Sequence, residues 1–114
     1  MIKKIRQLRF RAENRDIFEA IKDGRKTVET RAASPKFSDI KAGDIIVLKC
    51  GRERIEKLVK KATIFKNVES LIKKYKISQI HPGVNSFAEL GKKLVSFPGY
   101  REKIKKYGLI ALEI

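Results

Sequence analysis

The chain of 114 residues has one cysteine, one histidine and only 13 acidic side chains. A single cysteine, Cys50, excludes an intrachain disulfide and a thiolate metal cluster. A single histidine, His81, excludes a paired-histidine site, and the carboxylates are not clustered at the spacings of a metal site. We therefore expect neither a metal nor any other cofactor.

Long hydrophobic runs and glycine-rich loops are also lacking. No segment approaches the roughly 18 apolar residues of a membrane span. The first ten residues carry four cations and no continuous apolar stretch, so no secretory signal is expected. Glycines 83, 91 and 99 are isolated, which argues against a phosphate-binding loop. These absences predict a cytoplasmic protein without a membrane partner.

Positive charge is what the sequence has in excess. It has 28 Lys and Arg residues, a formal net charge of +15 and a pI of about 10.2. The basic surplus is shared by both halves of the chain, so it belongs to the folded surface rather than to a tail. Such a surface favours polyanionic partners. A heat-adapted surface is the alternative, but ion-pair networks need both signs and acids are the minority here.

The pattern of apolar residues and turn residues predicts one α+β domain over residues 1–114 with a largely antiparallel sheet. Asn14 and Gly24 are expected to bound the first helix, and Ser86 with Glu89 to form a capping box. The expected elements are an edge strand near 8–10, a helix over 14–23, a strand over 26–31, a buried strand over 45–48, a region over 54–65 that is ambiguous between helix and strand but favours strand at 62–65, helices over 67–75, 87–95 and 98–107, and a strand over 109–114.

The most informative segment runs from Gly24 to Arg31 and reads Gly-Arg-Lys-Thr-Val-Glu-Thr-Arg. Strand alternation places Glu29 and Arg31 on one face, whereas Lys26 has the opposite parity and needs a twist at the glycine to join them. The three charges either share a ligand site or face water as weak surface ion pairs.

If the three charges cluster, their chemistry follows from their neighbours. Glu29 between two cations should stay ionised, which makes it a poor general base. It would orient Lys26 and Arg31 or accept a hydrogen bond from an amino group of a ligand. Arg31 offers a planar fork for phosphate or carboxylate, and Lys26 a point charge or, if desolvated, a proton donor.

Other candidate residues carry weaker signals. His81 stands next to a proline in an expected loop, where a lone histidine is more often structural or solvated than functional. Cys50 is interpreted as a small hydrophobic residue of a buried strand. Most of the aromatic residues are expected in the core, and Tyr100, among glycine and basic residues, is the best candidate to stack on a base.

The motif Gly24, Lys26, Glu29, Arg31 resembles the G-x-K-x-x-E-x-R signature of the ASCH domain, a branch of the PUA-like superfamily. The turn at residues 41–44 and the closing strand at 107–114 are similar to the family's, as are segments 80–82 and 97–100. The resemblance implies a small β-barrel flanked by helices, with a cleft for the Lys, Glu and Arg side chains. It also implies binding of RNA.

We therefore expect an RNA-binding or nucleotide-binding module whose ligand contacts are Lys26, Glu29, Arg31, Arg25 and Tyr100. The alternative is an enzyme, a hydrolase of N-acetylated cytidine type or a ribonuclease, using Lys26 and Glu29. The hydrolase branch has a threonine nucleophile where this chain has Glu29, and a glutamate in the region that here reads residues 81–83. Both differences disfavour hydrolysis by that route. An interaction domain with a vestigial cleft is the third possibility.

Overall fold

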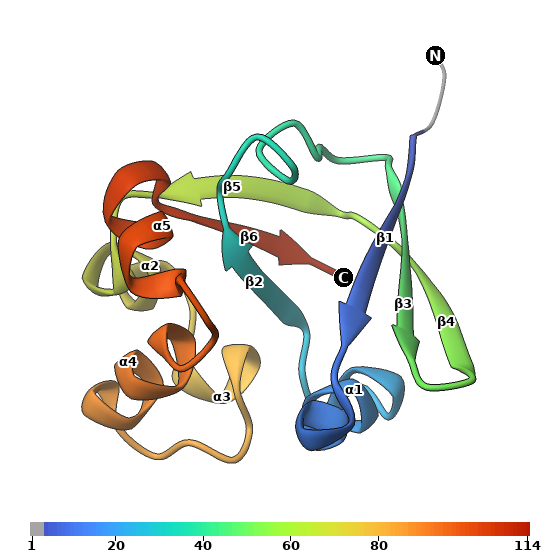
Figure 1. Cartoon of the computed structure of the whole chain (residues 1–114), viewed down its shortest axis with the longest axis horizontal. Coiled ribbons are helices and arrows are strands. Elements are labelled where there is room, and N and C mark those ends of the chain that lie inside the picture. The colour runs from blue at the N-terminus through green and yellow to red at the C-terminus, as the bar shows by residue number, and fades with distance from the viewer. Residues whose placement is uncertain (1–3) are drawn as a thin grey trace.

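The computed structural model describes residues 4–114 and has six strands, five α-helices and one turn of 3-10 helix (Figure 1). In chain order the elements are β1 (Ile5–Phe10), η1 (Ala12–Asn14), α1 (Arg15–Lys22), β2 (Val28–Ala32), β3 (Ile45–Cys50), β4 (Glu53–Leu58), β5 (Lys61–Phe65), α2 (Val68–Lys74), α3 (Ile77–Ile80), α4 (Phe87–Val95), α5 (Tyr100–Tyr107) and β6 (Leu109–Glu113).

The strands form two three-stranded sheets, in the orders β1-β3-β4 and β2-β6-β5. Three of the pairings are antiparallel, as expected, and the β1·β3 pairing is parallel. The edge position predicted for the first strand is confirmed, because within residues 4–114 β1 pairs only with β3. The α+β class is also confirmed.

The two sheets are joined where β4 runs on into β5. The backbone N–H of Val59 donates to Asp44 O in the first sheet, and that of Lys60 to Glu113 O in the second. The ambiguous region at 54–65 is therefore two strands with a bend between them, which explains its mixed period. On the other side the expected barrel is not closed: within residues 4–114, β1 and β2 share no ladder of backbone hydrogen bonds.

Two hydrophobic cores lie on either side of the β2-β6-β5 sheet. The first lies between the two sheets and includes Phe18 of α1. The second lies between β2-β6-β5 and helices α2 to α5, which gather on one side of the molecule (Figure 1). Register places Glu29 opposite Leu112 and Arg31 opposite Ile110, both of the first core. The charged face of β2 therefore points between the sheets, toward the open side.

The ends of the helices follow the sequence with three differences. Asn14 is the N-cap of α1, but its side chain makes no capping hydrogen bond. Ser86 Oγ accepts from Glu89 N at 3.2 Å as expected, whereas Glu89 Oε2 accepts from Asn85 N rather than from the serine. The short helix α3 was not expected. Within residues 4–114, no helix is long and apolar enough to cross a bilayer.

Candidate functional site

Lys26, Glu29 and Arg31 form a buried ion-pair cluster. Lys26 Nζ lies 3.3 Å from Glu29 Oε1, and Arg31 Nη2 lies 3.2 Å from Glu29 Oε2. Lys26 and Glu29 are each only 3% exposed. The alternative of three solvated surface charges is therefore wrong, and the lysine joins the other two despite its opposite parity.

The segment before β2 brings Lys26 into the cluster. Gly24 has φ +85°, a left-handed conformation that ends the run of α1 and turns the chain. The next residues are then tied down on both sides, because Lys26 N donates to Ala20 O and Thr27 N donates to Gln79 O. Lys26 thus precedes the regular strand β2. Strand alternation therefore does not place its side chain on the face opposite to Glu29 and Arg31.

The Lys26 ammonium group is held entirely by protein acceptors. Its Nζ donates to Val28 O at 2.8 Å and to Ile80 O, and it pairs with Glu29 Oε1. Burial lowers the pKa of the Lys26 amine below its ordinary value, while the Glu29 carboxylate acts in the opposite direction. Three acceptors match the three N–H donors of an ammonium group, so protein groups occupy every donor position of Lys26.

The Glu29 carboxylate is equally saturated. Oε1 accepts from Thr30 N at 3.0 Å and faces Lys26, and Oε2 accepts from both Nε and Nη2 of Arg31. Burial alone would raise the pKa of Glu29, but Lys26, Arg31 and the Thr30 N–H lower it on balance. Four donors fill the lone-pair sites of the carboxylate. Glu29 therefore orients its two cations and has no lone pair left for the amino group of a ligand.

Arg31 spans the open side of the fold and keeps donor capacity. Its Nη2 donates to Arg9 O at 3.3 Å, which links β2 to the end of β1. Its guanidinium carbon lies 4.9 Å from the ring centre of Phe10 and 5.9 Å from that of Phe37. Nη1 has no hydrogen-bond partner within residues 4–114, so the arginine is both fixed and able to bind.

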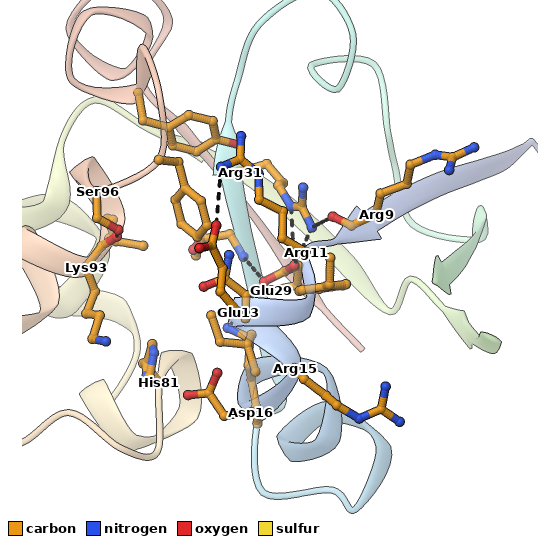
Figure 2. Close-up of a pocket in the computed structure, with 18 of the residues that line it drawn as sticks. Arg9, Arg11, Glu13, Arg15, Asp16, Glu29, Arg31, His81, Lys93 and Ser96 are labelled. Carbon is orange, nitrogen blue, oxygen red and sulfur yellow. Dashed lines mark hydrogen bonds and ion pairs between the residues drawn. The ribbon is translucent and has the colours of Figure 1, made fainter. Parts of the chain in front are cut away.

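A cavity of about 450 Å³ lies beside this cluster, between the end of β1, helix α1, β2 and the helical layer. Figure 2 shows Arg31 and Arg11 toward one end and His81, Asp16 and Lys93 toward the other, with Glu29 between, whereas the side chains of Arg9 and Arg15 point away. The residues that line it include six basic and three acidic ones, and the side chain of Arg15 is paired with Glu19 and Glu53. The basic residues are Arg9, Arg11, Arg15, Lys26, Arg31 and Lys93.

The other two predicted contact residues lie in different places. Tyr100 begins α5 and lines the cavity, with its ring 5.2 Å from that of Phe97, which also lines it. Arg25 does not line this cavity: it is exposed, and its Nε donates to Asp23 Oδ2 at 2.7 Å. It lies on a smaller hollow of about 290 Å³. The binding roles of both residues stay predictions.

His81 is buried, which agrees with the structural and not the solvated alternative for a lone histidine. It is 9% exposed rather than solvated, and neither ring nitrogen has a hydrogen-bond partner within residues 4–114. Burial lowers the pKa of its imidazole, helped by Lys26 and Lys93 and opposed by Asp16. The one feature of the sequence that bears on the position of His81 is Pro82, which ends the helix before the histidine.

Comparison with known proteins identifies the relatives of this fold. The family model of the ASCH domain matches residues 14–114. The crystal structure of hypothetical protein PH0355 is similar with 31% identity and a TM-score of 0.78, covering 98% of this chain and 96% of that one. The solution structure of protein PF0455 from Pyrococcus furiosus is similar with 28% identity and a TM-score of 0.70, covering 98% and 94%.

No curated protein matches the chain at a significant level. The family model covers most of the chain, including the Gly24 to Arg31 motif and the strand that closes the fold. Both structural neighbours extend over nearly the whole chain. The chain belongs to the ASCH domain family.

Proposed function

We propose that this domain binds single-stranded RNA in the cytoplasm and that its cavity receives one nucleotide of the strand. The observation that carries the proposal is Arg31, which lines the cavity and whose guanidinium is oriented by a buried carboxylate, with no hydrogen-bond partner for Nη1 within residues 4–114. A fixed guanidinium is suited to a phosphate oxygen.

Charge and size support the same function. A net charge of +15 gives salt-dependent attraction for a phosphate backbone. The cavity lies within the range of about 300–1,000 Å³ that is usual for small ligands. An unpaired base can leave a single strand and stack on aromatic rings such as those of Phe97 and Tyr100, whereas a base in a duplex is already stacked. ASCH domains are generally considered RNA-binding.

The geometry gives the hydrolase alternative less support. Glu29 accepts four donors and its pKa is lowered, so it is a weak base at neutral pH. The Nζ of Lys26 already directs its N–H donors at three protein acceptors, the carbonyls of Val28 and Ile80 and the carboxylate of Glu29. Neither residue is free to move a proton to or from a substrate, so binding is the better explanation of the cluster.

The test is the affinity of a short single-stranded RNA for the wild type and for Arg31→Ala, measured by fluorescence anisotropy. Arg54→Ala is the matched control, because it also removes one positive charge but lies outside the cavity, paired with Glu56 on β4. Loss of a charge-assisted hydrogen bond of about 1.5–3 kcal/mol predicts that Arg31→Ala weakens binding about tenfold or more.

Arg31→Lys keeps the charge but loses the fork, and it should recover only part of the affinity. Circular dichroism checks that each variant is folded. Equal losses in Arg31→Ala and Arg54→Ala would contradict the proposal, because RNA would then be held by surface charge alone.

A further inference from the structure

His81 occupies a fixed place in the backbone, one residue after the acceptor of Lys26. Its N–H donates to Ile77 O at 2.8 Å, and its carbonyl accepts from Val84 N at 3.0 Å. Its neighbour Ile80 accepts a hydrogen bond from Lys26 Nζ. The main chain at His81 is therefore fully bonded and tied to the cluster, and only the ring lacks partners.

An unpartnered ring at this depth needs an explanation. A buried polar group without a hydrogen bond costs about 1–3 kcal/mol, and such groups are few in native proteins. Both nitrogens of His81 are in this condition. A ligand that forms the missing hydrogen bonds would recover this free energy, and the ring lines the cavity in which such a ligand would lie.

The ring also separates two spaces. His81 lines the large cavity and the smaller hollow behind it, together with Asp16, Ile17 and Lys26. Both ring nitrogens are shielded from bulk solvent, so a hydrogen bond from one of them to a ligand requires the side chain to rotate. The imidazole can thus meet a group placed at the end of the cavity away from Arg31 (Figure 2).

The charged groups around the ring determine which ligand group it suits. Lys26 before β2 and Lys93 of α4 oppose its protonation, and Asp16 of α1 favours it. Burial also lowers the pKa of the imidazole, so the ring is neutral at neutral pH. A neutral imidazole has one N–H donor and one nitrogen acceptor, which complements the amino and carbonyl groups of a heterocycle better than the charge of a phosphate.

We propose that His81 is a base-reading residue, whose imidazole hydrogen-bonds the polar edge of a nucleobase while Arg31 holds the phosphate at the other end of the cavity. This inference rests on the proposed function and adds to it a division between a base end and a phosphate end. It also assigns a role to a residue outside the Gly24 to Arg31 motif.

The test uses the fact that His81 is the only histidine of the chain. In a protein without a histidine tag, the imidazole nitrogens give unambiguous ¹⁵N resonances. Titration with the four ribonucleoside 5′-monophosphates should shift these resonances for at least one base. Ribose 5-phosphate, which has the phosphate but no base, should shift the signals of Arg31 and leave the imidazole unchanged.

Two variants separate base reading from folding. His81→Leu should weaken binding of the preferred nucleotide about tenfold, the usual scale of a lost base contact. It should leave the affinity for ribose 5-phosphate unchanged and, since it removes an unpartnered polar group, it should not lower the free energy of unfolding. His81→Gln retains a donor and an acceptor and should recover part of the affinity.

The outcomes distinguish this inference from the function on which it rests. If nucleotides bind through Arg31 while the imidazole signals and the affinity of His81→Leu are unchanged, the base-reading role is overturned and the proposed function stands. If ribose 5-phosphate moves the ring as much as the nucleotides do, the division into two ends is overturned. If no nucleotide or RNA binds, both proposals are overturned.

Discussion

Glu29 lies buried between two cations and accepts hydrogen bonds from the Thr30 N–H and from Arg31. At the scale of single residues, Glu29 is the group that holds Lys26 and Arg31 together. Its carboxylate neutralises Lys26 and fixes the plane of the Arg31 guanidinium. Such a group is stabilising only while its partners remain, because an isolated buried charge is costly.

Replacing Glu29 with glutamine should therefore destabilise the fold strongly. Removing one partner of a buried ion pair costs about 3–5 kcal/mol, because the remaining charges stay buried without compensation. The measurement is urea-induced unfolding followed by circular dichroism. Glu56→Gln is the control, since the Glu56–Arg54 pair is exposed and should contribute no more than about 1 kcal/mol. Similar losses of unfolding free energy in both variants would contradict this prediction, because the buried ion pairs would then contribute no more than the exposed pair.

His81 gives the fold a specific dependence on pH. Its folded-state pKa is depressed below the ordinary 6.5 by burial and by Lys26 and Lys93. As pH falls through 6.5 the unfolded chain takes up the proton before the folded chain does, so stability falls. We expect the free energy of unfolding to be higher at pH 7.5 than at pH 5.5, and this difference to shrink in His81→Leu. An unchanged difference in the variant would contradict this origin.

The charges of the site could be predicted from sequence more readily than their burial. Alternation pairs Glu29 with Arg31, and Gly24 allows a twist by which Lys26 can join them without requiring it. The depth of His81 could not be predicted, because it depends on helices distant in sequence. The saturation of Glu29 required the positions of Thr30 N–H and of both guanidinium donors.

At the scale of elements, the site depends on how short segments are held against β2. Helix α3 has four residues, too few to show a helical period, yet Ile80 O accepts from Lys26 and Gln79 O accepts from Thr27 N. The sequence also did not predict that residues 54–65 divide into β4 and β5, because this division depends on pairing with strands of two different sheets. The long helix α4, with a clear period and a serine cap, was predicted with its observed bounds.

The junction between α5 and β6 should tolerate only glycine. Gly108 has φ +82°, and a Cβ there would lie 2.4 Å from the Phe65 carbonyl oxygen, a backbone atom that cannot move aside. With a ψ of −165° this backbone conformation is open essentially only to glycine and costs other residues about 1–3 kcal/mol, and the clash adds to it. Gly108→Ala should therefore lower the free energy of unfolding by more than about 2 kcal/mol in denaturant titrations.

Gly91 provides the contrasting substitution. It lies inside α4 with nothing within 4 Å of an added Cβ, so Gly91→Ala should stabilise the protein by about 0.5–1 kcal/mol. If Gly91→Ala and Gly108→Ala change stability in the same direction, this account of the junction is wrong.

At the scale of the whole molecule, the two sheets meet at the β4–β5 bend and separate at β1 and β2, where the cavity lies. Composition predicts a basic surface, because the surplus is spread over both halves of the chain, and this stays a prediction. The family resemblance suggested a barrel, but which side would be open depends on strand pairing. The extent of the domain over 1–114 stays a prediction.

The basic surface predicts a strong effect of salt on RNA binding. For a single strand, the slope of log affinity against log salt is about −0.7 for each phosphate neutralised. We expect a slope of about −2 or steeper, which corresponds to three or more phosphate contacts. Because the cavity takes an unstacked base, a duplex of the same sequence should bind more weakly. A flat salt response, or preference for the duplex, would contradict this prediction.

The most direct test of the central claim is the structure of this domain with a bound trinucleotide RNA. The account predicts one nucleotide inside the cavity, with a phosphate oxygen within hydrogen-bond distance of Arg31 Nη1 and the base toward His81. RNA bound along the outer surface, with neither Arg31 nor the cavity in contact with it, would contradict the account.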